Sequence, residues 1–466
     1  MGKNDKKPRS TPSTTSVTPS TLTTTLTSFS PSNGKSSNAS VYFAHLLRAP
    51  DHHTLRIYDV SSGQCVIRWG SNVTEGEEKD EERVASISWV LLPPAASAEA
   101  VGEGEEEAGE GKRGKKRRKS TSAAEGTTAG LMEKDSKLVF ALGLESGKIL
   151  FLSLNATNET TILSHPTSTL SLTTLVAPSR STSPHHAHLY TINTAGQVGL
   201  WELSALSNGT VAGNLIAKLA GLPENTPWDD LAVNYLPHPE PTAKKQTVQL
   251  VLSKLTLHVY SFHLAVGGAS KKDKVKDIKV TELGKCTGHI AAAHVEFTGI
   301  IPSTSATADD SAMASDDEED AAPKSTAIRF LSYSKTDRFV QIWSLGSGSK
   351  EGKLIARLGL EFGVAGVALG SSSLNADEEE VLAAVDGEGR VSLARLPLSF
   401  PEGSKKVFVL ETESIVKGKA GEGTDVNSIR LASEGEDSLV VCRGRVKPVF
   451  EVIVSLHFFP RLSRAY

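Results

Sequence analysis

Short apolar runs recur along the chain, and each is followed by a turn and then by a second run in which apolar and polar positions alternate. Leu138–Gly143 is followed by Lys148–Leu152, and Leu189–Asn193 is followed by Gln197–Trp201. This pattern predicts β-hairpins, because alternation with a period of two places apolar side chains on one face of a strand. Helical periodicity is nearly absent, so the chain is predicted to be all-β.

The most complete pattern lies near the middle of the chain. Gly288-His289 precedes the run Arg329–Ser334, the turn Asp337-Arg338 and the run Phe339–Trp343. A Gly-His followed by a strand, a turn and a strand that ends in Trp is typical of one blade of a WD-repeat β-propeller. Six weaker hairpins are found at Leu55–Trp69, Leu138–Leu152, Leu189–Trp201, Leu250–Tyr260, Val381–Ala394 and Ser438–Ile453. The sequence therefore predicts a single WD-repeat propeller of seven blades.

The polar residues of the complete repeat are expected to form one buried hydrogen-bonded network. Its members are His289, Ser332, Asp337 and Trp343. A His near an Asp is also compatible with catalysis, but the repeat by itself accounts for both residues, because buried polar groups need partners. We therefore interpret this network as structural.

Low-complexity segments interrupt or flank the hairpins. Residues 1–39 are rich in Ser, Thr and Pro and are predicted to be disordered. The propeller is predicted to span 40–454, with inserts at about 93–135 and 302–327 that surface loops can tolerate.

The two ends of the propeller are expected to meet. A propeller usually closes by pairing terminal strands, and Val41–Leu47 is the predicted partner for the end of the chain. Residues 455–466 neither complete a blade nor begin a helix, and we expect an atypical tail there.

Net charge is −4, with a pI of about 6.4, so the molecule as a whole is not a basic nucleic-acid coat. The charge is uneven, however. An acidic run at 103–110 is followed directly by a basic run, and a second acidic run lies at 309–320. The cations of the basic run are Lys112, Arg113, Lys115, Lys116, Arg117, Arg118 and Lys119. We predict that this run serves nuclear or nucleolar import or contacts RNA phosphates, the alternative being a solubilising loop.

No catalytic or cofactor motif is present. The sequence lacks Gly-x-Ser-x-Gly, a P-loop and His-Glu-x-x-His. His185, His186 and His188 could in principle hold a metal, but a solvated loop is the favoured interpretation because no carboxylate or Cys lies nearby in sequence. The acidic stretch 316–320 lacks the spacing of a calcium loop. The protein is predicted to be non-enzymatic, without cofactor or metal.

The cysteines and the N-terminus indicate an intracellular protein. Cys65, Cys286 and Cys442 are far apart and show no zinc spacing, which favours buried apolar cysteines in a reducing compartment. The polar N-terminus has no apolar signal-peptide core, and no run approaches transmembrane length.

The order of these landmarks resembles that of one WD-repeat family. Leu55–Asp59, Ala85–Trp89 and the basic insert come first, followed by Leu200–Leu203, and Lys447–Val452 looks like the family's last blade. The chain is thus similar to the Utp-five family of the small-subunit processome, called WD-repeat protein forty-three in animals. The similarity covers roughly residues 41 to 454.

The resemblance implies a non-catalytic scaffold in ribosome biogenesis. Members of that family belong to the UtpA subcomplex, which binds the 5′ external transcribed spacer of pre-ribosomal RNA and supports its transcription. The implied partners are other UtpA subunits, pre-rRNA and small nucleolar ribonucleoprotein, reached directly or through partners, with no membrane and no small-molecule substrate. The implied location is the nucleolus. The family's C-terminal helical domain is expected to be missing here.

Two other classes of function stay open. One is a WD-repeat adaptor of another complex, such as a ubiquitin-ligase substrate receptor or a chromatin reader, whose mark would be an arginine-lined mouth of the central channel. The other is a propeller enzyme, which would need carboxylates or histidines converging at one mouth of the channel. The strand ends suggest no such convergence.

Overall fold

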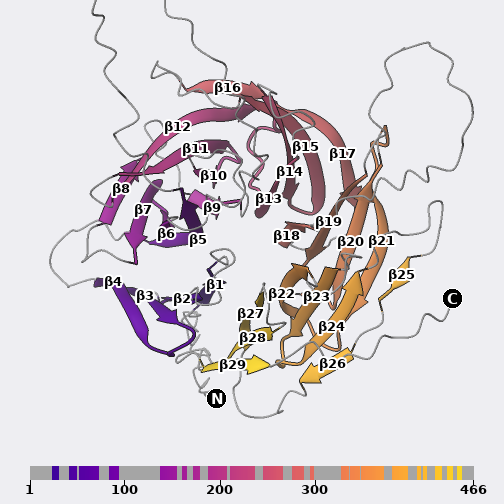
Figure 1. Ribbon diagram of the computed structural model, residues 1–466. Helices are drawn as coiled ribbons and strands as arrows, with labels where there is room; N and C mark the ends of the chain where they lie inside the picture. The colour runs from indigo at the N-terminus through magenta and orange to yellow at the C-terminus, as the bar shows by residue number, and fades with distance from the viewer. Residues whose placement is uncertain are drawn as a thin grey trace, which may run out of the picture.

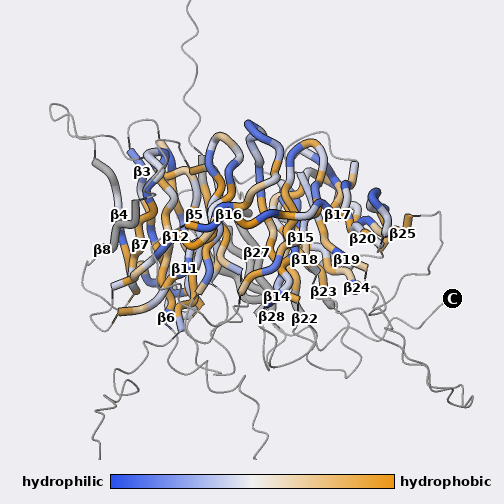
Figure 2. The backbone as a smooth tube through the Cα atoms, turned by 90° about the horizontal axis from the view of Figure 1, so that it is seen from above, coloured by the Kyte–Doolittle hydropathy of each residue, from blue (hydrophilic) through white to orange (hydrophobic). Residues whose placement is uncertain are grey.

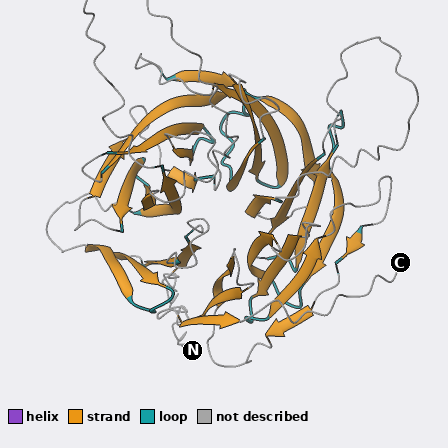
Figure 3. Cartoon of the chain, in the orientation of Figure 1, coloured by secondary structure: helices purple, strands orange, loops and turns teal. Residues whose placement is uncertain are grey.

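The computed structural model describes the strands of the chain and their short turns. The described residues are 24–30, 41–49, 52–72, 83–93, 137–154, 160–164, 172–178, 187–206, 210–236, 245–265, 275–287, 294–298, 327–334, 336–346, 348–371, 380–396, 407–410, 413–416, 426–432, 438–443 and 449–453. Within these ranges every regular element is a β-strand and none is a helix (Figure 3). The all-β prediction is confirmed.

The strands form sheets arranged in a ring (Figure 1), and we call the middle of this ring the central channel, as in other propellers. Blade 1 contains β1 (Thr24–Phe29), β2 (Tyr42–Arg48), β3 (His52–Asp59) and β4 (Cys65–Asn72), and blade 2 contains β5 (Val84–Leu92), β6 (Lys137–Leu144), β7 (Lys148–Ser153) and β8 (Thr160–Ser164). Blade 3 contains β9 (Leu172–Val176), β10 (Ala187–Asn193), β11 (Val198–Ala205) and β12 (Val211–Ala220), with β16 (Lys276–Lys279) added at its edge. Blade 4 contains β13 (Asp230–Tyr235), β14 (Lys245–Ser253), β15 (Thr256–Ala265) and β17 (Thr281–Thr287).

The second half of the chain continues the ring. Blade 5 contains β18 (His294–Phe297), β19 (Ile328–Tyr333), β20 (Phe339–Leu345) and β21 (Lys353–Gly359), with β25 (Phe408–Val409) added at its edge. Blade 6 contains β22 (Val364–Ser371), β23 (Glu380–Asp386), β24 (Val391–Leu396) and β26 (Glu413–Val416). The last sheet contains β27 (Val426–Ala432), β28 (Ser438–Arg443) and β29 (Val449–Ile453).

The number of complete blades is six, not the seven that the sequence predicts. The last sheet, β27–β29, has three strands among the described residues. It lies between blades 6 and 1, where β27 contacts both β22 and β1 (Figure 1). The ring is thus continued by an incomplete sheet.

Two findings in the N-terminal part of the chain differ from expectation. Strand β1 lies inside the range 1–39, for which disorder was predicted, and it pairs antiparallel with β2, while the rest of that range, apart from Ser30, lies outside the described residues. Val41–Leu47 does not pair with the end of the chain, because β2 has β1 on one side and β3 on the other. The Thr-rich sequence of β1 does not by itself predict a strand, and the strand is recognised only from its pairing with β2.

Every predicted hairpin is present. The complete repeat forms the antiparallel pair β19–β20, in which Phe330 lies opposite Trp343. Five of the weaker hairpins likewise join the second and third strands of a sheet, whereas Leu55–Trp69 forms the outer pair β3–β4 of blade 1. The alternation predicted the hairpins but not their position within a blade.

The core lies between neighbouring sheets. Tyr190 and Val198 of blade 3 pack with Leu250 of blade 4, and Leu331 of blade 5 packs with Leu382 of blade 6. All five side chains are fully buried or nearly so. Because each sheet buries both faces against its neighbours, the inner strands carry near-continuous apolar runs. In Figure 2 the strands are accordingly orange along much of their length and blue at the tips of the hairpins.

Three consecutive blades are joined by the same device, which we call a clasp. In each, the connection between the third and fourth strands pairs in parallel with the outer strand of the preceding blade. Blade 4 supplies β16 to β12, and blade 6 supplies β25 to β21. Blade 5 supplies a shorter clasp, in which Lys285 donates its amide to Lys350 at 2.9 Å and accepts that of Gly352 at 2.7 Å.

The two faces of the ring differ in the length of their connections. Hairpins between second and third strands are tight at one face, as at 145–147, 194–197 and 254–255. We call this the turn face. Connections between first and second strands begin and end at the opposite face, and they include 93–136 and 298–327. We call this the insert face.

Candidate functional site

The innermost strands surround the central channel and are tied to one another by side-chain to backbone hydrogen bonds. Four of these bonds run from Trp89 Nε1 to the Ser28 carbonyl (3.2 Å), from the Leu175 amide to Ser86 Oγ (2.8 Å), from Thr174 Oγ1 to the Asp229 carbonyl (3.4 Å) and from the Val295 amide to Asp230 Oδ2 (3.1 Å). They join blades 1 to 5 in order. They hold the channel wall in place, because a broken bond would leave a polar group unpaired.

Four polar residues gather where β13 and β18 begin, at the turn face. Asp230 opens β13 and His294 opens β18, and His294 Nδ1 lies 2.5 Å from Asp230 Oδ2. Glu296 is two residues further along β18, on the same face of the strand as His294. Tyr333 on β19 lies opposite His294, and the two rings are 5.1 Å apart between centroids. We call Asp230, His294, Glu296 and Tyr333 the channel cluster.

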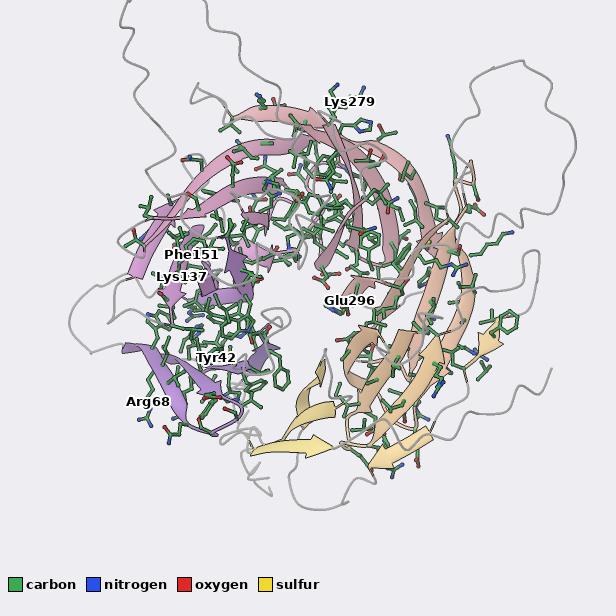
Figure 4. All side chains as sticks on the ribbon, in the orientation of Figure 1. Tyr42, Arg68, Lys137, Phe151, Lys279 and Glu296 are labelled. Carbon is green, nitrogen blue, oxygen red and sulfur yellow. The ribbon has the colours of Figure 1, made fainter. Side chains whose placement is uncertain are left out.

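Electrostatics within the channel cluster are dominated by burial. Burial raises the pKa of the Glu296 carboxyl, which His294 lowers and Asp230 raises further. Burial also raises the pKa of the Tyr333 hydroxyl, with additional contributions from Asp230 and Glu296. Figure 4 shows Glu296 on the inner side of the ring of sheets. The contact between Asp230 and His294, at the starts of two neighbouring blades, was not predicted from the sequence.

A second charged group lies on the turn face between blades 1 and 2. His53 Nδ1 accepts the Val84 amide at 3.0 Å, which ties β3 to the start of β5. Burial lowers the pKa of His53, and Arg48 and Arg83 lower it further. The pKa of Arg48 is likewise lowered by burial and raised by Glu145. Arg48 and Arg83 therefore lie within electrostatic range of the hydrogen bond between His53 and Val84, which we interpret as structural.

Part of the predicted WD network is present. Trp343 Nε1 donates to Ser332 Oγ at 2.8 Å, and both residues are buried. Asp337 accepts the amide of the adjacent Arg338 at 2.7 Å, and no hydrogen bond links it to Ser332 or Trp343. His289 lies outside the described residues.

Blade 3 contains a similar pair that the sequence analysis missed. Trp201 Nε1 donates to Thr191 Oγ1 at 3.2 Å, again from the third strand to the second strand of the blade. The signal was available, since Trp201 ends a hairpin strand just as Trp343 does. A Thr hydroxyl serves here where Ser serves in blade 5.

The basic run and most of the histidine cluster lie outside the described residues. This applies to Lys112, Arg113, Lys115, Lys116, Arg117, Arg118 and Lys119, and also to His185 and His186. His188 is described and buried, and its Nδ1 lies 2.8 Å from the Tyr235 hydroxyl. That contact gives His188 a place in the core between blades 3 and 4.

The two described cysteines differ in burial. Cys286 is buried, which raises its pKa to about 12, whereas Cys65 is half-buried. The expectation of buried cysteines therefore holds for Cys286 and not for Cys65.

Within the described part of the chain, no three His, Cys, Asp or Glu residues gather as metal ligands. That part also contains no helix long and apolar enough to cross a membrane.

A ring of radial four-stranded sheets, built from hairpins with the Trp–Ser pair of a WD repeat, defines a WD-repeat type β-propeller. No family model matches the chain, and no curated protein matches it. Similar solved structures include the Chaetomium thermophilum polycomb repressive complex 2 (8% identity, 91% of this chain and 92% of that chain, TM-score 0.47). Another is the computationally designed Ika8 protein (10% identity, 88% of this chain and 93% of that chain, TM-score 0.38). At this level of similarity the assignment of the fold depends on the sheets themselves.

Proposed function

We propose that the protein is a non-catalytic scaffold in ribosome biogenesis, a small-subunit processome component that acts in the nucleolus. Its work is to bind UtpA-type subunits and the 5′ external transcribed spacer of pre-rRNA, for maturation of the small-subunit RNA and support of its transcription. A propeller suits this role because its rigid ring displays loops on two faces at fixed positions.

One observation supports the proposal, namely that the two connections containing the oppositely charged runs begin and end at the same face of the ring. The basic run lies in the connection 93–136 and the acidic run 309–320 lies in the connection 298–327. Both connections join a first strand to a second strand, so both begin and end at the insert face. A cationic run in a connection that starts and ends at this face can reach RNA phosphates.

The first experiment is crosslinking of the tagged protein in its own cells, followed by sequencing of the bound RNA. We expect reads concentrated in the 5′ leader of pre-rRNA and a nucleolar signal. A variant with all seven cations of Lys112–Lys119 changed to Ala should lose the nucleolar signal, the RNA reads or both. A cytoplasmic protein with no enrichment of ribosomal RNA would refute the proposal.

A second experiment separates RNA contact from import. The purified protein is titrated with 5′ leader RNA at several salt concentrations. Each phosphate contact to single-stranded RNA contributes about 0.7 to the slope of log K against log salt, so losing seven cations should lower the slope by up to about 5. The matched control neutralises the acidic run 309–320 with Asn and Gln, and we expect it to leave the slope unchanged or slightly steeper. An unchanged slope in the Ala variant would assign the run to import.

A WD-repeat adaptor of another complex is the second candidate. The observation that favours it is the channel cluster, which places polar side chains where propellers can hold a short peptide. The expected mark of such an adaptor was an arginine-lined mouth. At the starts of β13 and β18 the described charged residues are instead Asp230, His294 and Glu296.

A further inference from the structure

The outer strand of blade 1 has an edge that no described strand covers. In the sheet of this blade β4 is the last strand, and among the described residues it pairs with β3 alone. The register between the two strands shifts near Cys65 and is then unbroken from Ile67 to Asn72. Figure 1 shows β4 on the outside of the ring. An open edge of this kind presents backbone N–H and C=O groups with which an extended segment can pair.

Two arginines lie side by side on one face of blade 1. Arg56 of β3 is directly opposite Arg68 of β4, and Arg68 is exposed at the outer side of the blade (Figure 4). Like charges in directly opposite positions destabilise a sheet. Neither guanidinium group forms a hydrogen bond or an ion pair with a described residue. An anion from outside the blade would therefore stabilise this pair.

The strands of blade 1 have no carboxylate to spare for these arginines. Their one acidic residue is Asp59, at the end of β3. Its Oδ1 accepts the Ser61 amide at 2.9 Å and the Ser61 hydroxyl at 2.7 Å. Asp59 thus serves the turn that follows β3, and the charge of the blade is positive.

The clasp of blade 4 shows what an outer edge accepts in this protein. Strand β16 pairs in parallel with the outer strand β12 and places Asp277 opposite Lys218. The next pair along is Ile278 opposite Leu219, which packs into the core between blades 3 and 4. An acidic residue of the clasp thus lies beside the cation of the outer strand, and the apolar residue that follows extends the core.

Strand β4 repeats the pattern of β12. Arg68 corresponds to Lys218 and Trp69 corresponds to Leu219, because in each strand a cation is followed by an apolar residue that packs against the core. Trp69 is only partly buried, so an apolar side chain laid next to it would extend the core between blades 1 and 2. A clasp for β4 should therefore contain an acidic residue followed directly by an apolar residue.

An extended segment of another protein fits this edge better than the alternatives. A second copy of the chain that paired through the same strand would bring two more arginines to the edge, which like-charge repulsion disfavours. RNA could neutralise the two arginines, but it has no peptide groups to pair with the backbone of Ile67–Asn72. A peptide can satisfy both the backbone and the charge.

We propose that the outer edge of β4 binds an extended segment of a partner protein as a parallel fifth strand of blade 1, with an Asp or Glu opposite Arg68 and an apolar residue next to Trp69. Main-chain hydrogen bonds to Ile67–Asn72 supply the affinity, and the two side chains select the sequence. The site does not depend on the ribosomal role proposed above, because a partner from any complex could use it.

The test begins with a phage-displayed library of random 12-residue peptides, selected on the full-length protein. Enriched peptides are synthesised with a fluorescent label, and their dissociation constants are measured by polarisation. We expect an Asp or Glu followed directly by an apolar residue at a fixed position. Failure to enrich peptides with this pair would overturn the proposal.

Charge variants of the protein assign the binding to β4. Arg68→Glu should raise the dissociation constant about tenfold or more. Arg357→Glu is the matched control, because Arg357 is also exposed on an outer strand but β25 already covers the edge of that strand, and the affinity should not change. The double variant Arg56→Glu, Arg68→Glu should bind the peptide in which Lys replaces the acidic residue. Equal affinity in the wild type and in Arg68→Glu would contradict the proposal.

Methylation of the peptide backbone tests strand pairing itself. In an extended strand, alternate N–H groups point toward the same neighbouring strand. N-methylation at every second residue of the peptide should therefore abolish binding, whereas N-methylation at the residues between should be tolerated. Equal tolerance at all positions would show that the peptide binds through its side chains alone, and strand addition would be refuted.

Two measurements on Arg68→Glu without peptide separate binding from other roles. The variant removes the like-charge pair with Arg56, so its melting temperature should stay the same or rise. A marked fall would show a structural role for Arg68, and the binding role would then be withdrawn. The affinity for 5′ leader RNA should be close to that of the wild type, and a loss of about tenfold would assign the two arginines to RNA and overturn the proposal.

Discussion

At the scale of single residues, paired tryptophans mark where the WD repeat is retained. The indole N–H of Trp343 is satisfied by Ser332, and that of Trp201 is satisfied by Thr191. In both blades the bond joins the third strand to the second strand of the same sheet. Because a buried N–H without an acceptor is costly, the hydroxyl is as important as the indole.

We predict that Ser332→Ala destabilises the protein by about 1–3 kcal/mol, since it leaves the buried Trp343 N–H without an acceptor. Urea unfolding followed by tryptophan fluorescence measures the change. The double variant Ser332→Ala, Trp343→Phe removes donor and acceptor together, so it should lose less than the sum of the two single changes. Simple additivity would show that the bond contributes nothing.

Gly196 forms the turn of blade 3 with φ at +77°, and a Cβ there would overlap the Thr226 carbonyl in the connection between blades 3 and 4. We expect Gly196→Ala to lower the free energy of unfolding by about 2–4 kcal/mol, through strain and overlap together. Gly63 is the control, because its φ is +66° but nothing lies within 4 Å of an added Cβ. Gly63→Ala should cost only about 1–2 kcal/mol. Equal losses would remove the overlap as a cause.

Some of these residues could be predicted from the sequence and others could not. Trp343 and Ser332 could, because the spacing of a strand, a turn and a strand fixes their register. Glu296 could not, because it occupies an alternating position in His-Val-Glu-Phe that reads as an exposed strand face. Only the arrangement of blades 4, 5 and 6 around the channel turns that face into an enclosed one.

At the scale of elements, the clasps join blades 3 to 6 beyond their apolar contacts. Each adds backbone hydrogen bonds between one blade and the next, as where Leu410 donates its amide to Arg357 at 3.0 Å. The clasp of blade 5 also covers the thiol of Cys286, because Gly352 packs directly against it. The Cys286 thiol is therefore buried only while the clasp of blade 5 is closed.

We predict that Gly352→Ala opens the clasp between blades 4 and 5, because an added Cβ would overlap Cys286 Sγ. The loss of stability should be about 1–3 kcal/mol. With a pKa of about 12, Cys286 should hardly react with a disulfide reagent at neutral pH in the wild type and should react faster in the variant. Gly346→Ala, in the same connection with open space around it, should leave the rate unchanged. A slow Cys286 in Gly352→Ala would mean that the clasp stays closed.

The hairpins could be predicted from the sequence, whereas the edge strands could not. Strand β16 lies in a Lys-rich stretch, and β25 has two residues. Strand β16 has no apolar pattern of its own, and β25 lies in an apolar run of only four residues, 407–410, so each is defined by its partner strand in another blade. Strand β1 was overlooked for the same reason, because Thr-rich sequence becomes a strand only against β2.

At the scale of the whole molecule, a hydrogen bond between two blades makes the stability of the ring depend on pH. His53 accepts the Val84 amide at the joint between blades 1 and 2, which requires an unprotonated Nδ1. Its pKa is lowered from 6.5 by burial and by Arg48 and Arg83. Burial similarly lowers the pKa of His258 in blade 4. The folded ring thus binds fewer protons at these two sites than the unfolded chain does.

We predict that, at these two sites, acid weakens the ring as the pH falls from 6.5 through the lower pKa values of the folded state. Glu296 and Asp229, whose pKa values are raised by burial, act in the opposite sense. His53→Asn keeps an acceptor for Val84 and cannot titrate, so its free energy of unfolding should fall less between pH 7.5 and about pH 5.5 than that of the wild type. His263→Asn, an exposed change on β15, is the control. The same pH dependence in wild type and His53→Asn would remove this joint as the sensor.

The direction of the clasps has a consequence for how the chain is made. Each of the three is supplied from further along the sequence than the strand it covers: β16 follows β12, Gly352 follows Lys285, and β25 follows β21. As the chain leaves the ribosome, blades 3, 4 and 5 therefore emerge with an outer edge that still lacks its neighbour. Each of these three edges is covered only when the later connection has been translated, so blades 3 to 5 are completed one blade behind synthesis.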